Sequence, residues 1–133
     1  MIDLDDLVAW LTAVPTELDY SFRKGPRQPE FGLADLVALV TPLEGPGLTL
    51  DGLGSVSSFQ IKLVAREHQE TACRKSAFQI DDALLFSDTP GDLWGTWIQY
   101  VNRLGGEPAS LEEDEHDRIA YVCSYVAHET PVR

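Results

Sequence analysis

A change of hydrophobic period between residues 55 and 85 constrains the fold more than any other feature of this sequence. From Ser55 to Arg66, apolar and polar side chains alternate, which is typical of a strand with one buried face. The alternating apolar residues are Phe59, Ile61, Leu63 and Ala65. From Thr71 onward the apolar residues recur every three or four positions, which predicts a helix of roughly five turns ending at Leu85. The stripe residues are Cys73, Ala77, Ile80 and Leu84.

This strand and helix predict one layer pair of an α+β domain. The helix covers one face of the sheet to which the strand belongs. The opposite face carries Lys62 and Arg66, and we expect it to be open to solvent or to a partner. At 133 residues the chain fits one domain spanning residues 1–133, and its 44% hydrophobic content argues against disorder.

The formal net charge of -12 and the pI near 4.4 argue strongly against a free-standing nucleic-acid binder, because phosphate contacts are made mainly by Lys and Arg. The sequence contains no apolar run of the roughly 18 residues that a membrane helix needs, and its first residues are acidic where a signal peptide is basic. We therefore expect a cytoplasmic protein without membrane contact. Cys73 and Cys123 stand far apart with no CxxC partner, so we interpret them as buried core residues.

Other stretches predict the remaining elements. Apolar residues at helical spacing from Ile2 to Val14 predict an opening helix that Pro15 ends. Residues 16–33 contain several Pro and Gly and predict a long loop, which is either a mobile surface loop or an arm that contacts a partner. Residues 36–41 predict a strand inside the sheet, stopped by Pro42. The glycine-rich residues 44–54 predict a hairpin loop, because they lack the lysine and the spacing of a phosphate-binding loop.

The second half of the chain predicts two further strands. Residues 93–104 are rich in Trp, Tyr and Ile, and residues 118–128 alternate with both faces largely apolar. An acidic run at residues 112–117 separates these strands and is expected to be a solvated loop. The predicted fold class is therefore α+β in the order αββαββ, with one four-stranded, mostly antiparallel sheet and two helices packed on one face.

The sequence contains no recognisable catalytic or metal-binding motif. The three histidines do not form HExxH, GxSxG is absent, and the acidic run does not have the spacing of an EF-hand. Asp81 and Asp82 are adjacent on the predicted helix, so their side chains diverge by about 100° and cannot act jointly as acid and base. Asp82 is expected to face solvent. We therefore expect no enzymatic activity, no cofactor and no metal.

Several short segments, taken in order, resemble the tail terminator or minor capsid proteins of long-tailed (siphovirus-type) bacteriophages, particularly those of actinobacterial hosts. The segments are the opening helix with Leu4, Leu7, Val8 and Leu11, the strand into Thr41-Pro42, Gly45-Pro46-Gly47-Leu48-Thr49, Phe59-Gln60-Ile61, Ile80-Asp81-Asp82-Ala83-Leu84-Leu85, Arg103-Leu104-Gly105-Gly106-Glu107-Pro108 and Tyr121-Val122-Cys123-Ser124-Tyr125. Together they span nearly the whole chain. Residues 16–33 depart from the pattern.

The resemblance implies a structural virion protein of the head-tail junction, assembled in the host cytoplasm. Such a subunit forms a homo-oligomeric ring, expected to be a hexamer, that caps the tail tube and joins it to the head-completion (connector, or neck) proteins. DNA would only pass through the lumen of the ring, without specific binding. Two other classes stay open: a small ligand-binding or enzymatic α+β domain, and an accessory protein that binds a bacterial partner.

A ring of acidic subunits needs positive groups on one subunit to meet negative groups on the next. Three of the ten cations lie within residues 16–33, and the acidic run supplies a candidate complement. The residues predicted to contact a neighbouring subunit or the tail are Arg23, Lys24, Arg27, Lys62, Arg66, Glu112, Glu113, Asp114 and Asp117.

Overall fold

The computed structural model describes residues 2–25, 36–43, 55–113 and 118–129. Within these ranges the chain forms two α-helices, one short 3-10 helix and seven strands. In chain order the elements are α1 (Leu4–Thr12), β1 (Ser21–Lys24), β2 (Val37–Leu43), β3 (Ser55–Arg66), η1 (Glu67–Gln69), α2 (Glu70–Leu85), β4 (Gly91–Leu93), β5 (Thr96–Arg103), β6 (Ala109–Glu113) and β7 (Arg118–Glu129).

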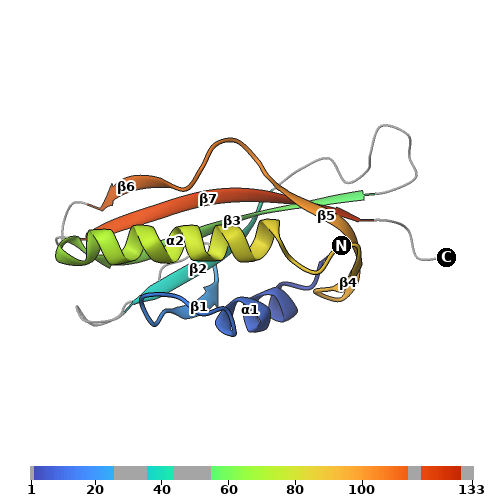
Figure 1. Ribbon diagram of the computed structural model, residues 1–133, viewed down its shortest axis with the longest axis horizontal. Helices are drawn as coiled ribbons and strands as arrows, with labels where there is room; N and C mark the ends of the chain where they lie inside the picture. Colours follow the sequence, from blue (N-terminus) through green and yellow to red (C-terminus); the bar gives the residue numbers. More distant parts are fainter. Residues whose placement is uncertain (1, 26–35, 44–54, 114–117, 130–133) are drawn as a thin grey trace.

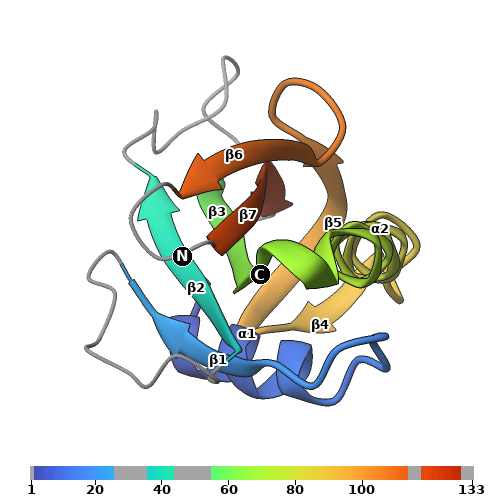
Figure 2. The same ribbon diagram turned by 90° about the vertical axis from the view of Figure 1, so that its left-hand side faces the viewer.

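The seven strands form one mixed sheet, in the order β1-β2-β3-β7-β5-β4, and β6 also pairs with β7 (Figure 1). β1 runs parallel to β2, and every other pairing is antiparallel. β3 and β7 are the longest strands and pair along their whole length, from Ser55↔Glu129 to Arg66↔Arg118. Viewed end-on, the sheet curls so that its two edge strands, β1 and β4, both lie near α1 (Figure 2).

One face of the curled sheet, here called the inner face, packs against both helices. The predicted alternation holds, because Phe59, Ile61, Leu63 and Ala65 are all buried in one core cluster with the α2 stripe. Leu7 and Leu11 of α1 belong to the same cluster and are fully buried. The expected strand at Ser55–Arg66 is confirmed, and so is the helix that follows it, which begins at Glu70 and ends at Leu85.

The opening helix is also confirmed, and a local cap explains where it begins. Asp3 has extended backbone angles, and its side chain accepts hydrogen bonds from the backbone N–H groups of Asp5 and Asp6, at 2.8 and 3.3 Å. An aspartate in this position satisfies donors that have no partner within the helix and also interacts favourably with the helix dipole. The helix ends at Thr12, just before Pro15.

The predicted αββαββ order and four-stranded sheet are wrong, because the described residues form seven strands in the order αβββαββββ within one curled mixed sheet. Two of the missed strands lie in stretches that we expected to be loops. β1 lies within residues 16–33 and has only four residues, too few for a clear alternation. β6 contains Glu112 and Glu113, which have low strand propensity, and it is a strand because it pairs with the edge of β7. Both strands depend on a neighbour distant in sequence.

The expected single strand at residues 93–104 is instead a hairpin, β4 and β5, with a two-residue turn at Trp94-Gly95. Both turn residues have positive φ, 52° and 83°, which is the pattern of a type I′ turn. Tryptophan is unusual in this conformation, so the sequence does not indicate a turn here. The indole of Trp94 is buried and contacts Trp10 and Phe59 edge to face, at centroid distances of 5.4 and 6.0 Å. Tertiary packing therefore supports a turn that local preference disfavours.

Smaller differences concern the other strands. β2 lies inside the sheet as expected, but it continues through Pro42 to Leu43. Proline is tolerated there because β1 pairs only with residues up to Val40, so the missing N–H can face an unpaired edge. The last strand is confirmed and ends at Glu129. The predicted 44–54 loop lies outside the described residues.

The face opposite the helices, here called the outer face, is not simply open to solvent. Val37, Leu39, Val64 and Ala120 lie on it and are all buried, with exposed fractions of at most 3%. Lys62 and Arg66 share this face and are half-buried. The expectation of an open, cationic face is therefore wrong for its middle part. None of the described helices is long and apolar enough to cross a membrane.

Candidate functional site

The two described cations of the predicted 16–33 arm point to opposite faces of β1. Lys24 lies opposite Val40, a core residue, and its Nζ forms an ion pair with Asp5 Oδ1 of α1 at 2.9 Å. The hydrogen bond with Asp5 raises the pKa of Lys24. This cation is therefore already neutralised within its own chain, where it ties α1 to an edge strand.

Arg23 points to the outer face instead, because its parallel partner Leu39 lies on that face. Its side chain is exposed, and its Nε donates a long hydrogen bond of 3.4 Å to Ser21 Oγ on the same strand. The third predicted cation, Arg27, lies outside the described residues. Of the predicted cationic cluster, the structure therefore shows Arg23 as a side chain presented to solvent.

The predicted acidic complement is placed only in part. Glu112 and Glu113 are the last residues of β6, where they pair in register with Ile119 and Arg118. Asp114 and Asp117 lie outside the described residues. β6 and β1 are separated by β7, β3 and β2, so one chain does not bring the cations of β1 and the acidic strand together. A contact between them would have to join two copies, which remains a prediction.

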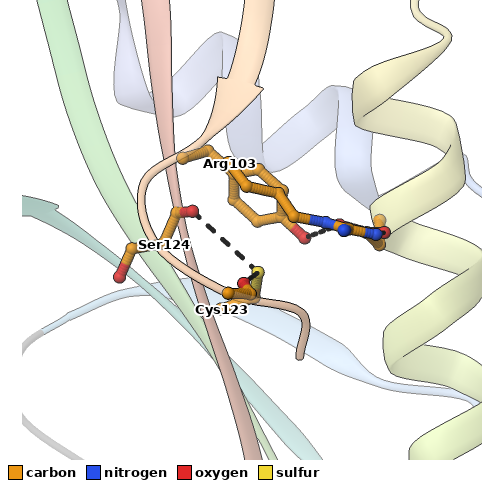
Figure 3. Close-up of polar contacts among 6 residues, drawn as sticks. Arg103, Cys123 and Ser124 are labelled. Atoms are coloured by element: carbon orange, nitrogen blue, oxygen red, sulfur yellow. Dashed lines mark hydrogen bonds and ion pairs between the residues drawn. The ribbon is translucent and has the colours of Figure 1, made fainter. Parts of the chain in front are cut away.

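The acidic residue Asp81 is buried and forms a polar cluster with Arg103 and Tyr125. Asp81 on α2 has no exposed surface, and Arg103 at the end of β5 reaches it through two hydrogen bonds. Figure 3 shows the Arg103 side chain extending toward the helix. Arg103 Nε lies 2.9 Å from Asp81 Oδ1, and the terminal Nη2 contacts Oδ2. The hydroxyl of Tyr125 on β7 donates to the same Oδ1 at 2.9 Å.

The environment of the cluster keeps Arg103 charged and Tyr125 neutral. The hydrogen bonds to Asp81 raise the pKa of Arg103, so the guanidinium stays charged. Burial, with the neighbouring Cys123 thiol, raises the pKa of Tyr125, so the phenol stays neutral and keeps its donor. Both carboxylate oxygens of Asp81 are occupied by these partners. The arrangement can fasten α2 to β5 and β7, and it leaves no oxygen of Asp81 without a donor.

The two cysteines are buried and free, as expected, and each contacts a polar group. The Tyr20 hydroxyl donates to Cys73 Sγ at 3.0 Å, and Cys123 Sγ lies 3.6 Å from the carbonyl oxygen of Gly106. Burial raises the pKa of both thiols, which keeps them in the protonated, unreactive form. Cys123 lines a cavity of about 10 Å³, which has room for roughly one water molecule.

A row of aromatic side chains crosses the outer face at the end of the sheet formed by β4, β5 and β7. Trp97 pairs across the hairpin with the exposed Asp92, and Tyr100 pairs with His128 after a bulge between Ile98 and Tyr100. The rings of Tyr100 and His128 are stacked, with centroids 4.1 Å apart and planes at 21°. Trp97 and Tyr100 are 41% and 45% exposed, although the strand that carries them is paired on both sides, with β4 and with β7. We call these four residues, Asp92, Trp97, Tyr100 and His128, the aromatic row.

Neither the Asp81 cluster nor the aromatic row was predicted as a site. Asp81 follows Ala77 by four residues and therefore lies on the buried stripe of α2, which is a signal that the sequence does contain. The prediction that Asp82 faces solvent is confirmed. The aromatic row gives no such signal, because the bulge at residue 99 decides which aromatic rings share a face.

Comparison with known proteins gives a result at the level of the fold. No protein-family model matches the sequence, and no curated protein sequence matches it. Among solved structures, a chain from the virion of a native gene transfer agent particle is similar, with a TM-score of 0.56 and 15% sequence identity. The likeness covers 94% of this chain and 85% of the other. The two chains therefore share a fold over nearly the whole length of this protein.

Proposed function

We propose that this protein is a structural component of a bacteriophage or phage-like virion. The observation that carries the proposal is the fold shared with a chain of a gene transfer agent virion over 94% of this chain. The segment pattern seen in the sequence supports the same class independently, because it resembles structural proteins of long-tailed phages. We also propose that the protein acts by assembly and not by catalysis.

Within that class, the role we propose is that of a tail terminator. The subunit forms a ring, of six copies, that caps the tail tube and joins it to the head-completion proteins at the head-tail junction. Its partners are other copies of itself, the tail tube protein and the connector. Assembly takes place in the host cytoplasm. The net charge of -12 supports a conduit through which DNA slides without specific binding.

The Asp81 cluster supports an assembly role through rigidity. It fixes the end of α2 to β5 and β7, the strands that carry the aromatic row. A subunit that must fit its neighbours in a closed ring benefits from surfaces held in one geometry, because ordering a mobile surface on association costs free energy.

Electron microscopy of particles tests the proposed function. The protein is labelled with gold through a tag in particles made by a producing strain, and a second strain lacks the gene. We expect label at the head-tail junction, and unjoined heads and tails in the deletion strain that the wild-type gene restores. Label elsewhere on the particle would refute the terminator role but would still support a structural role in the virion. Particles without label and with normal tails would refute both.

A further inference from the structure

The aromatic row has the character of a contact surface. Aromatic residues are enriched in the centres of protein interfaces, where they bury a large area with little loss of side-chain freedom. Trp97 and Tyr100 lie on the outer face, opposite the core residues Ile98 and Val101, so their exposed area contributes nothing to the core. Burial lowers the pKa of His128, so its ring is neutral at pH 7 and completes an uncharged aromatic surface beside Asp92.

The charge around the row defines what can bind there. From residue 76 to residue 102 the chain contains four Asp and no Lys or Arg. Two copies that met row to row would place each Asp92 in an interface where residues 76–102 of both copies supply only acidic charges and no cation to pair with it. A symmetric contact is therefore disfavoured, and the complementary surface should carry a positive charge.

Arg23 is an exposed cation on the same outer face, at the opposite edge of the sheet. β1 is one edge strand and β4, which carries Asp92, is the other. A guanidinium binds the faces of Trp and Tyr rings and also pairs with a carboxylate, and the aromatic row offers both next to each other. A head-to-tail contact joins two different patches of the same chain, and the Arg23 side of β1 and the aromatic row are two such patches.

We propose that the aromatic row is the docking surface for β1 of a second copy of this chain, with Arg23 of that copy placed over Trp97 or Tyr100 and next to Asp92. This inference rests on the proposed ring and names its interface. It differs from the sequence prediction, in which the acidic run at residues 112–117 is the complement of Arg23.

Cross-linking between two single-cysteine variants tests the contact. Ser21→Cys places a thiol beside Arg23, and Asn102→Cys places one beside Tyr100; both positions are exposed, whereas the native cysteines are buried. The two purified variants are mixed and oxidised, and Ser21→Cys mixed with Glu113→Cys is the matched comparison. We expect a cross-linked dimer in the first mixture and much less in either variant alone, because a head-to-tail contact joins unlike positions.

Substitutions in the interface then measure its contribution. Arg23→Glu and Tyr100→Ala should each weaken association, measured by light scattering over a concentration series, by roughly tenfold or more. Asp92→Arg introduced into the wild-type chain should weaken its association. Asp92→Arg combined with Arg23→Glu in one chain should partly restore association, because the charges of the two patches are exchanged. The controls are Phe86→Ala, which removes an aromatic residue that is 83% exposed on another part of the surface, and Arg74→Glu, which reverses an exposed cation on α2.

The outcomes separate this inference from the proposed function. Rings in negative-stain images together with the Ser21–Asn102 cross-link support the inference. Rings without that cross-link, or with the cross-link to position 113 instead, overturn the inference and leave the ring standing. If neither rings nor a head-to-tail cross-link form at any protein concentration, both the proposed ring and this inference are overturned.

Discussion

The ion pairs Arg103–Asp81 and Lys24–Asp5 each fasten a helix to the sheet, and they differ in how far they are removed from water. Arg103 and Asp81 join β5 to α2, and the Asp81 side chain is fully buried. Lys24 and Asp5 join β1 to α1, and their side chains are 52% and 75% exposed. Both pairs have short contacts between opposite charges, so geometry alone does not distinguish them.

The two ion pairs differ in whether water can solvate the charges when the contact between them is broken. Water solvates Lys24 and Asp5 as soon as they separate, so their pairing gains little. Asp81 has no access to water, and its stability depends on the donors that the fold supplies. A buried charge is therefore tolerated only where the fold supplies hydrogen-bond donors or an opposite charge. Some other buried positions on α2 are surrounded by apolar side chains and supply neither. The following predictions use this contrast, from the largest expected effect to the smallest.

The largest effect is expected when a charge is buried on α2 without a partner. Leu84 lies three residues beyond Asp81 on the same stripe and has no exposed surface. Leu84→Asp removes a core side chain and buries a carboxylate in apolar surroundings, at a cost comparable to the whole stability of a small domain. We expect no cooperative unfolding transition by circular dichroism. Phe86→Asp, at an exposed position two residues on, should fold normally, and a cooperatively melting Leu84→Asp would refute the core assignment.

Removing the buried acid itself should have a smaller but clear effect. Asp81→Ala leaves the Tyr125 hydroxyl without its acceptor and frees Arg103, so we expect the free energy of unfolding to fall by about 3 kcal/mol. Denaturant titration measures this loss. The neighbouring Asp82→Ala is the matched control, because Asp82 is exposed and should change the free energy little. Equal effects of the two substitutions would show that the cluster does not stabilise the fold.

Tyr125→Phe isolates one hydrogen bond of the same cluster. The ring keeps its stacked contact with Phe59, at a centroid distance of 5.6 Å, so packing is retained. Arg103 still satisfies Asp81 through two hydrogen bonds, and the expected loss is therefore only about 1 kcal/mol. The same titration measures it, and a loss as large as that of Asp81→Ala would mean that Tyr125, rather than Arg103, holds the carboxylate.

The contrast between the two pairs also shows what the sequence could and could not predict. Strong periodicity over many residues predicted α1, β3, α2 and β7 correctly, because in these elements the buried face is set by the chain's own pattern. The short strands β1 and β6 carry no such pattern, and they exist because a distant strand offers them an edge. The β4–β5 turn is formed by a buried tryptophan with positive φ, which local preference disfavours.

The candidate sites follow the same rule. The sequence identified Arg23 as a cation that could meet another copy, and the structure places it exposed on an edge strand. It could not show that Lys24, the next residue, points the other way to Asp5. The pairing of Asp81 with Arg103 joins residues 22 positions apart, and the aromatic row depends on a bulge. The sequence therefore predicted which residues are charged or apolar. It did not predict which residues contact one another or lie on the same face of the sheet, because these depend on the three-dimensional fold.

The smallest effect is expected for the exposed pair. Lys24→Met keeps an unbranched side chain of nearly the same length and removes its charge, and at pH 7 we expect the melting temperature to stay within measurement error of the wild type. The stability that the ion pair contributes depends on pH in a defined direction.

Because Asp5 raises the pKa of Lys24 above its ordinary value of 10.5, the full stabilisation by the pair is present below pH 10.5 and is lost as the pH rises through the folded-state pKa of Lys24. Burial also raises the pKa of Tyr20 and Tyr125, which lowers stability at high pH in both proteins alike, so only the difference between the variants is informative. A clear loss of stability at pH 7 would mean that the exposed pair behaves like the buried one and that burial does not explain the contrast between them. A difference between the variants that grows above pH 10.5 would contradict the raised pKa of Lys24.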